Sequence, residues 1–230
     1  MVDYSPFAET FWRSRDTLHW SEIDDILRIF VDDFSSLKKW SIADIWCWNG
    51  RLLTHILEWF WSYFGSREVD YSGLDTSPIL LDQAREKFPT HPGIKEVSWI
   101  CRDMWEMNDI FAGQKFDALF FIASFHHLET PHQREKILLH AKNILTPWGK
   151  IFIINWHLLA PAQGKYTSSK TRSYTDGSAD FLIKIGKYAR YYHAFSSEEY
   201  SHLAWKAWLT LQKLEWGERN SVVIFSLIRN

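Results

Sequence analysis

Strand-like and helix-like segments alternate along most of this 230-residue chain. Short apolar runs are separated by stretches in which apolar residues recur at helical spacing, as in RLLTHILEWF over 51–60. Alternation of this kind is typical of a parallel sheet covered by helices. The predicted strands cover residues 41–45, 69–75, 96–101, 116–123, 150–156, 211–215 and 221–228. We therefore predict a single α/β domain with a seven-stranded, mostly parallel sheet flanked by helices.

Several predicted helices carry start signals. Ser77 is followed by Pro78, which suits an N-cap and the first helical position. Thr130 and Gln133 have the spacing of a capping box, and a further helix is predicted over about 197–207. We expect residues 1–35 to form one or two helices that cap the sheet.

The loop after the first predicted strand reads DIWCWNGR, from Asp44 to Arg51. With glycine at positions 46 and 48 it would read DIGCGNGR, a strand-to-helix loop on which a nucleotide can lie. Such a loop needs residues without a Cβ, often at positive φ, and only glycine adopts that conformation cheaply. Trp46 and Trp48 therefore stand where the pattern requires glycine.

Composition and position point to the same exchange. The chain has 10 glycines and 14 tryptophans, whereas about 16 glycines are expected at this length. Trp148 follows Pro147 at a predicted type II turn, Trp208 follows a predicted helix, and Trp40 lies at the predicted turn before the first strand. Either the chain has lost cofactor binding, or codons read naturally as glycine, such as UGA in some genetic codes, have been translated as tryptophan. Trp12, Trp20 and Trp156 look like ordinary tryptophans.

Candidate chemical groups follow the predicted strands. Asp75 and Asp103 end the second and third strands, where carboxylates can accept ribose hydroxyls or reach a base. His126 and His127 follow the fourth strand, but adjacent histidines diverge, and no metal-binding spacing occurs. We therefore expect no metal site, and we find no nucleophile–base triad.

Residues 160–195 are predicted to form an insertion on the substrate side, with few apolar periodic runs. Basic residues hold phosphates and tyrosines stack on unpaired bases, which suggests an RNA partner, although a solvated loop is the plain alternative. The basic residues are Lys165, Lys170, Arg172, Lys184, Lys187 and Arg190, and the tyrosines are Tyr166, Tyr174, Tyr188, Tyr191 and Tyr192.

Compartment and partners are less constrained. Cys47 and Cys101 suggest no disulfide framework and fit a reducing cytoplasm. No apolar run is long enough to span a membrane, and the N-terminal residues resemble neither a signal nor a transit peptide. A net charge of −2 favours neither acidic nor basic partners.

Together these motifs resemble the class I S-adenosylmethionine-dependent methyltransferases, which have a Rossmann-like fold. More narrowly, the chain is similar to the family that methyl-esterifies carboxymethyluridine at the tRNA wobble position, which includes the methyltransferase domain of the AlkB-type tRNA enzyme. The matching segments are DIWCWNGR, GLDTS over 73–77, FHHLET over 125–130 with Arg134, LTPWGKIFIINW over 145–156, RYYHAF over 190–195 and GERNSVVI over 217–224. Trp46, Trp48, Trp148 and Ser221 depart from the family pattern.

The resemblance implies S-adenosylmethionine as cofactor and tRNA as partner. The implied cofactor-binding residues are Asp44, Trp46, Cys47, Trp48, Asn49, Gly50, Arg51, Asp75, Thr76, Asp103, Met104 and Ala123. The implied catalytic residues are His126, His127 and Arg190, and the implied substrate-binding residues are Trp156, Arg190, Tyr191, Tyr192 and His193. A small-molecule methyltransferase and a cofactor-free pseudoenzyme remain the alternatives.

Overall fold

The structure is a computed structural model that describes residues 19–60, 62, 67–89, 94–186 and 188–228. The chain divides into two compact units, an N-terminal unit over residues 1–120 and a C-terminal unit over residues 121–230. Trp12, Lys187 and most of the predicted N-terminal cap lie outside the described residues.

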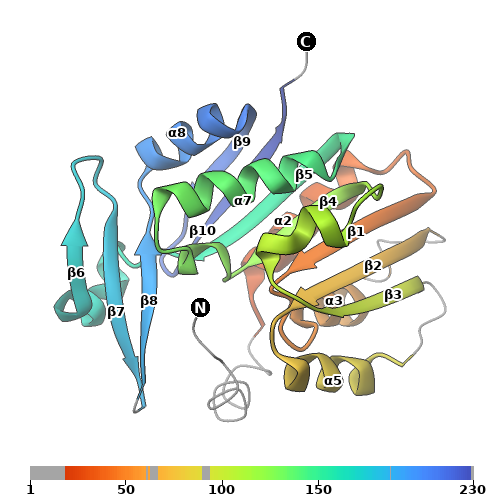
Figure 1. The fold of residues 1–230 in the computed structure, drawn as a ribbon, viewed down its shortest axis with the longest axis horizontal. Coiled ribbons are helices and arrows are strands. Elements are labelled where there is room, and N and C mark those ends of the chain that lie inside the picture. The colour runs from red at the N-terminus through yellow and green to blue at the C-terminus, as the bar shows by residue number, and fades with distance from the viewer. Residues whose placement is uncertain (1–18, 61, 63–66, 90–93, 187, 229–230) are drawn as a thin grey trace. The chain divides into compact units, whose positions relative to one another are not determined.

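The N-terminal unit contains parallel strands with helices between them (Figure 1). Strand β1 (Lys39–Ile45) pairs in parallel with β2 (Glu68–Asp75) and with β4 (Phe116–Ile122), whose last residues lie past the unit boundary. Strand β2 also pairs in parallel with β3 (Ile94–Cys101). The helical elements are α2 (Ser21–Asp33), α3 (Arg51–His55), the π-helical turn η1 (Ile56–Phe60), α5 (Pro78–Lys87), the 3₁₀ turn η2 (Met104–Glu106) and α6 (Met107–Ile110).

The C-terminal unit contributes strands β5 (Leu145–Trp156), β9 (Leu209–Trp216) and β10 (Asn220–Leu227) to the large sheet. Strand β10 runs antiparallel to both β5 and β9. Helices α7 (Pro131–Asn143) and α8 (Ser197–Ala207) contact each other, and a 3₁₀ turn, η3 (Phe125–His127), precedes α7. The strand order β3-β2-β1-β4-β5-β10-β9 confirms the predicted seven-stranded sheet.

The predicted helix starts are confirmed. Ser77 Oγ accepts a hydrogen bond from the Leu80 backbone N–H at 3.4 Å. Thr130 and Gln133 form the complete capping box, because each side chain accepts from the backbone N–H of the other. Among the described residues, none of the helices has the length and apolar character needed to cross a membrane.

The predicted insertion contains more regular structure than its sequence suggested. A 3₁₀ helix, η4 (Pro161–Ser169), leads into an antiparallel sheet of β6 (Lys170–Ser173), β7 (Ala179–Ile185) and β8 (Tyr188–Ala194) (Figure 1). Phe181, Ile183 and Tyr192 from this sheet bury one face together with Leu158. Because only one face is apolar, polar residues interrupt the pattern and hide the strands from a search for apolar runs.

Two predicted turns at tryptophan are wrong. Trp148 lies inside β5 and is 63% exposed, without a positive φ. The pairing with β10 starts only at Lys150, so Pro147 lies outside that antiparallel ladder and can stay extended beside it. Trp40 lies within β1, fully buried, where its indole N–H donates to the Phe34 carbonyl oxygen at 2.9 Å. A buried and hydrogen-bonded indole is well suited to its position.

Candidate functional site

The backbone of the loop after β1 has the geometry that glycine favours. Trp46 has a φ of 62°, Trp48 of 57° and Gly50 of 81°. The N–H groups of Trp46 and Cys47 both donate to the Leu74 carbonyl oxygen of β2, at 2.7 and 3.0 Å. The left-handed conformation costs a residue with a Cβ roughly 1–2 kcal/mol. The loop therefore keeps the shape of a glycine loop although two of its positions carry indoles.

Left-handed backbone and tryptophan coincide elsewhere in the chain. Four non-glycine residues among those described have positive φ: Trp46, Trp48, Ala123 and Trp208. Trp208 is the C-cap of α8, with φ 56° and ψ 48°, and its side chain is 68% exposed. This confirms the prediction that Trp208 occupies a helix-ending position where glycine is usual. An exposed indole there gains little burial to offset the strained backbone.

The space around the loop is tight. A Cβ added to Gly50 would lie 2.7 Å from the Phe88 ring and 2.9 Å from the Trp99 ring. A Cβ on Gly73 would lie 2.6 Å from Trp99 and 2.8 Å from the Cys47 sulfur. Glycine therefore fits both positions closely, and the Cys47 side chain beside Gly73 is itself buried. A loop packed this closely has little room to shift in response to added side chains.

Asp44, the first residue of the loop, is a buried carboxylate with one unsatisfied oxygen. Tyr71 donates its hydroxyl to Asp44 Oδ2 at 2.7 Å, and Oδ1 has no hydrogen-bond partner among the described residues. Burial raises the pKa of Asp44 to about 7, against the opposing effect of the Tyr71 hydrogen bond. A buried acceptor without a partner is costly unless a ligand donor satisfies it.

Asp75 ends β2, and Asp103 follows the end of the neighbouring strand β3 by two residues, close to the predicted places. Asp75 Oδ2 accepts from the Trp48 N–H at 3.0 Å and Oδ1 from the Ser77 N–H at 2.9 Å. Burial raises the pKa of Asp75 to about 6 and raises that of Asp103 as well. Asp75 therefore connects the loop after β1 directly to the end of β2.

The other predicted cofactor residues of the N-terminal unit lie around the same loop. Arg51 places its guanidinium 4.8 Å from the centre of the Trp20 ring and 4.9 Å from that of Trp48. Asn49 and Met104 are buried, and the Thr76 carbonyl oxygen accepts from the Cys101 thiol at 3.7 Å. The loop backbone, the unsatisfied Asp44 oxygen and the Asp75 carboxylate fit a nucleotide cofactor. The indoles of Trp46 and Trp48 do not, because they add bulk where a backbone approach is needed.

Ala123 and the two predicted histidines belong to the C-terminal unit. Ala123 has a φ of 54°, and its N–H donates to the Ile154 carbonyl oxygen at 2.8 Å. His126 accepts at Nδ1 from the Trp156 N–H at 3.2 Å, and its own backbone N–H donates to Asn155 Oδ1 at 3.1 Å. His127 lies 2.9 Å from the Tyr191 carbonyl oxygen through Nδ1, which must therefore carry a hydrogen.

Both histidines are neutral at physiological pH. Burial lowers the pKa of His126 well below its usual value and lowers that of His127 to about 3. Their rings lie 4.3 Å apart in an edge-to-face arrangement, and both contact the Tyr192 ring. They can accept or donate single hydrogen bonds, but they are weak bases.

The remaining predicted substrate residues surround this pair. Trp156 stacks on Tyr192, with ring centres 4.9 Å apart, and on Tyr166 at 6.1 Å. Arg190 is buried, with its guanidinium 5.4 Å from the Tyr192 ring centre. Burial lowers the pKa of Arg190 to about 10, so the group stays charged.

His193 belongs to a buried chain of charged side chains that the sequence reasoning missed. Its Nδ1 lies 2.8 Å from Asp180 Oδ1 and its Nε2 lies 2.6 Å from Glu199 Oε2. Glu199 Oε1 is also 2.9 Å from Arg134 Nε. Asp180 accepts from the hydroxyls of Tyr174 and Tyr191, both at 2.6 Å.

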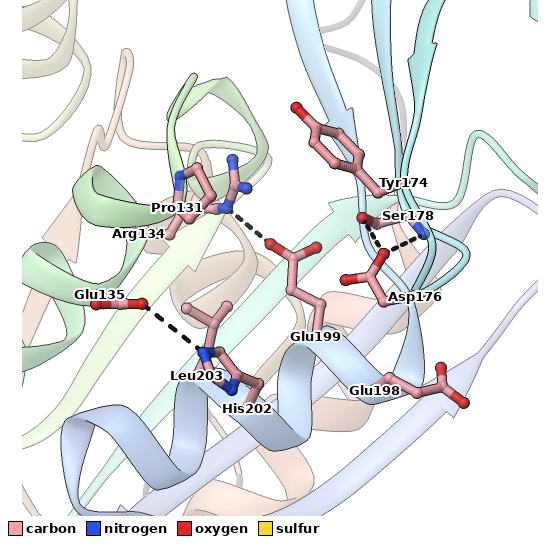
Figure 2. A pocket seen from close by; sticks show the side chains of 10 residues that line it. All are labelled: Pro131, Arg134, Glu135, Tyr174, Asp176, Ser178, Glu198, Glu199, His202 and Leu203. Carbon is pink, nitrogen blue, oxygen red and sulfur yellow. Dashed lines mark hydrogen bonds and ion pairs between the residues drawn. The ribbon is translucent and has the colours of Figure 1, made fainter.

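The pKa of Asp180 shows how fully the side chains of this charge chain are hydrogen-bonded. Burial alone would raise the pKa of Asp180, but hydrogen bonds from His193, Tyr174 and Tyr191 outweigh it and hold the pKa at about 2. A hollow of about 490 Å³ opens beside this charge chain. It is lined by Arg134, Tyr174, Glu199 and His202 among others (Figure 2). Asp180 could have been noticed as the lone acid in a mostly apolar strand, ADFLIKI.

Comparison with known proteins supports the class that the sequence resembles. A family model for methyltransferase domains matches residues 42–149. An S-adenosylmethionine-dependent methyltransferase from Clostridium acetobutylicum aligns with a TM-score of 0.65 at 14% identity, over 97% of this chain and 98% of that chain. DesVI of Streptomyces venezuelae aligns with a TM-score of 0.63 at 20% identity, over 99% and 100%. The sugar N-methyltransferase KedS8 from a Streptoalloteichus species aligns with a TM-score of 0.61 at 19% identity, over 96% and 92%. No curated protein matches the chain.

The methyltransferase-domain model over residues 42–149 and the shared fold together support a class I S-adenosylmethionine-dependent methyltransferase, a class whose cofactor is S-adenosylmethionine. The methyltransferase part of the resemblance is thus confirmed. Of the predicted cofactor residues, the structure ties the loop from Asp44 to Arg51 to Asp75, and it places Asp103 and Met104 after the neighbouring strand β3, whereas Ala123 lies in the C-terminal unit. The structure brings His126, His127, Trp156 and residues 190–193 together in the C-terminal unit.

Proposed function

We propose that the natural protein binds S-adenosylmethionine on the loop after β1 and carries glycine at positions 46 and 48. The observation that carries this proposal is the left-handed backbone at both positions, within a loop tied to Asp75. Asp44 and Asp75 would hold donor groups of the cofactor, since both are buried carboxylates at the ends of parallel strands. Trp208 is a third tryptophan with left-handed backbone, outside the loop. This favours a systematic replacement of glycine by tryptophan over the decay of the cofactor site alone.

We further propose that the acceptor is a carboxymethyl group on the wobble uridine of a tRNA. The support is the narrower sequence resemblance of FHHLET and RYYHAF, together with the aromatic stack of Trp156, Tyr192 and Tyr166. Stacked aromatic rings are suited to unpaired bases. Lys165, Lys170 and Arg172 are exposed on the neighbouring segment and are suited to phosphate contacts.

The chemistry asks little of the protein beyond positioning. When bound, S-adenosylmethionine supplies an electrophilic methyl group together with its own leaving group. A substrate carboxylate oxygen forms the new O–CH₃ bond while the S–CH₃ bond breaks, and no proton moves. Neutral His126 and His127 are compatible with this, since no general base is required. Arg190 would orient the carboxylate or an adjacent phosphate, because its charged fork can form two bonds to either.

The test uses the Trp46→Gly/Trp48→Gly variant with methyl-labelled cofactor. We expect label transfer to tRNA that carries the carboxymethyl group and none to the same tRNA without it. Arg190→Lys should lower turnover with unchanged cofactor affinity, and Arg28→Lys, an exposed change on α2, serves as its control. Transfer to a panel of small sugars and carboxylic acids, with none to tRNA, would instead favour the small-molecule alternative, which the fold shared with KedS8 also allows.

A further inference from the structure

Three potential metal ligands of the N-terminal unit converge outside the cofactor loop. His19 directly precedes the N-cap of α2, Asp24 lies in the first turn of that helix, and His55 is the last residue of α3. One ligand atom from each side chain lies within 4.8 Å of the other two. The three are separated by up to 36 positions in sequence, which is why ligand spacing gave no sign of them.

The two imidazoles share one carboxylate. His19 Nε2 lies 2.6 Å from Asp24 Oδ2, and His55 Nδ1 lies 3.2 Å from Asp24 Oδ1. The two rings stack with centres 5.1 Å apart and an interplanar angle of 30°. Both nitrogens therefore already point at the same carboxylate, one from each side, which is the arrangement that an ion between them would need.

We infer that His19, Asp24 and His55 form a binding site for a divalent transition-metal ion of the Zn²⁺ type. Two imidazole nitrogens and one carboxylate oxygen are a donor set that such ions prefer, with a fourth position left for water. Atoms bound to one ion at about 2.1 Å lie no more than about 4.2 Å apart, so side-chain rotations on the order of an ångström complete the site.

Access and charge set the expected strength of the site. The His19 side chain is 41% exposed and that of Asp24 is 14% exposed, so an ion can enter from solvent, whereas that of His55 is 5% exposed. The site has one carboxylate, and the Arg51 guanidinium acts electrostatically on His55. With only one carboxylate as ligand and the Arg51 cation nearby, the site should bind a metal ion with modest affinity and should not be permanently filled.

A metal ion here would fasten the start of α2 to the end of α3, the helix that leaves the cofactor loop at Arg51. The inference does not rest on the proposed function, because metal binding can be measured without cofactor or substrate. The bound ion would link α2 directly to α3, the helix that carries Arg51 and His55. The expected consequence is a higher melting temperature in the presence of Zn²⁺.

The experiment titrates the tag-free, metal-free chain with Zn²⁺ by calorimetry and with Co²⁺ by visible absorption. We expect one ion per chain and Co²⁺ bands typical of a four-coordinate nitrogen and oxygen site. His19→Ala and Asp24→Asn should each weaken binding by at least about tenfold, since each removes a direct ligand. Both positions lie at the chain surface or close to it, and circular dichroism checks that the variants fold.

A matched control is available in the C-terminal unit. His202 lies 3.9 Å from Glu135 as another exposed histidine–carboxylate pair without a second imidazole. His202→Ala should leave Zn²⁺ and Co²⁺ affinity unchanged. Equal binding by the parent, His19→Ala and Asp24→Asn chains would overturn the inference, as would the absence of any one-to-one binding by the parent chain.

Discussion

The cofactor loop of the N-terminal unit and the buried charge chain of the C-terminal unit satisfy their polar groups in opposite ways. In the loop, Asp44 keeps an unsatisfied buried oxygen, and two tryptophans adopt strained backbone. In the charge chain, both nitrogens of His193 meet carboxylates, and the Asp180 carboxylate accepts three hydrogen bonds. Strain and missing partners are typical of a site built for a ligand, whereas complete pairing is typical of structural support.

The largest expected effect is the recovery of cofactor binding by the loop. The chain with Trp46 and Trp48 should show no useful affinity for S-adenosylmethionine, because the indoles occupy the approach to the backbone. The Trp46→Gly/Trp48→Gly variant should bind at least about 100-fold more tightly, a gain of about 2.7 kcal/mol or more. Isothermal titration calorimetry measures both chains. Micromolar binding by the tryptophan-containing chain would refute the claim that glycine is needed there.

Disrupting the charge chain should produce the next largest effect, on stability. Glu199→Gln removes the charge that His193 and Arg134 share, and breaking a buried ion pair by removing one partner costs about 3–5 kcal/mol. Urea denaturation measures the change in the free energy of unfolding. Glu198→Gln on the same helical turn is exposed and should change stability by no more than about 0.5 kcal/mol. Similar losses of unfolding free energy in both variants would mean that the buried charge chain adds no special stability.

Asp44 of the cofactor loop and the buried His127 of the C-terminal unit should respond to pH with opposite signs. Burial raises the pKa of Asp44 to about 7, so its contribution to stability is present at acidic pH and is lost as pH rises through 7. Burial lowers the pKa of His127 to about 3, so its contribution is present above its ordinary value of 6.5 and is lost as pH falls toward 3.

Variants separate these opposing contributions. Asp44→Asn should become more stable relative to the parent chain as pH rises from 4 to 8, and His127→Gln should do so as pH falls from 7 to 4. Each change should be on the order of 2–4 kcal/mol, since one pKa unit corresponds to about 1.4 kcal/mol. Denaturant titrations across this pH range provide the measurement. A constant offset from the parent at every pH would contradict the assigned burial effects.

The same two regions mark what sequence could and could not predict. The loop, Asp75 and Asp103 were predicted because each follows a strand directly, so that local patterning fixes its place at the sheet edge. The charge chain was missed because Asp180, His193 and Glu199 come from two strands and a helix, and only the antiparallel pairing of β7 with β8 brings the first two together. Local rules also failed at Trp40 and Trp148, where tertiary packing and strand continuity decide the backbone conformation.

The smallest effect distinguishes two exposed tryptophans. Trp208 caps α8 with a φ of 56°, whereas Trp148 lies in extended backbone within β5. Trp208→Gly should therefore stabilise the chain by roughly 1 kcal/mol, because glycine adopts the left-handed conformation without strain. Trp148→Gly should destabilise it by roughly 0.5–1 kcal/mol, because glycine in a strand loses conformational entropy and packing. Both side chains are more than 60% exposed, at 68% and 63%, so differences in burial contribute little. Thermal and urea denaturation compare the two variants with the parent chain. If both substitutions stabilised the chain, the removal of an exposed indole would be the cause. The left-handed backbone at Trp208 would then no longer be evidence that glycine belongs at that position.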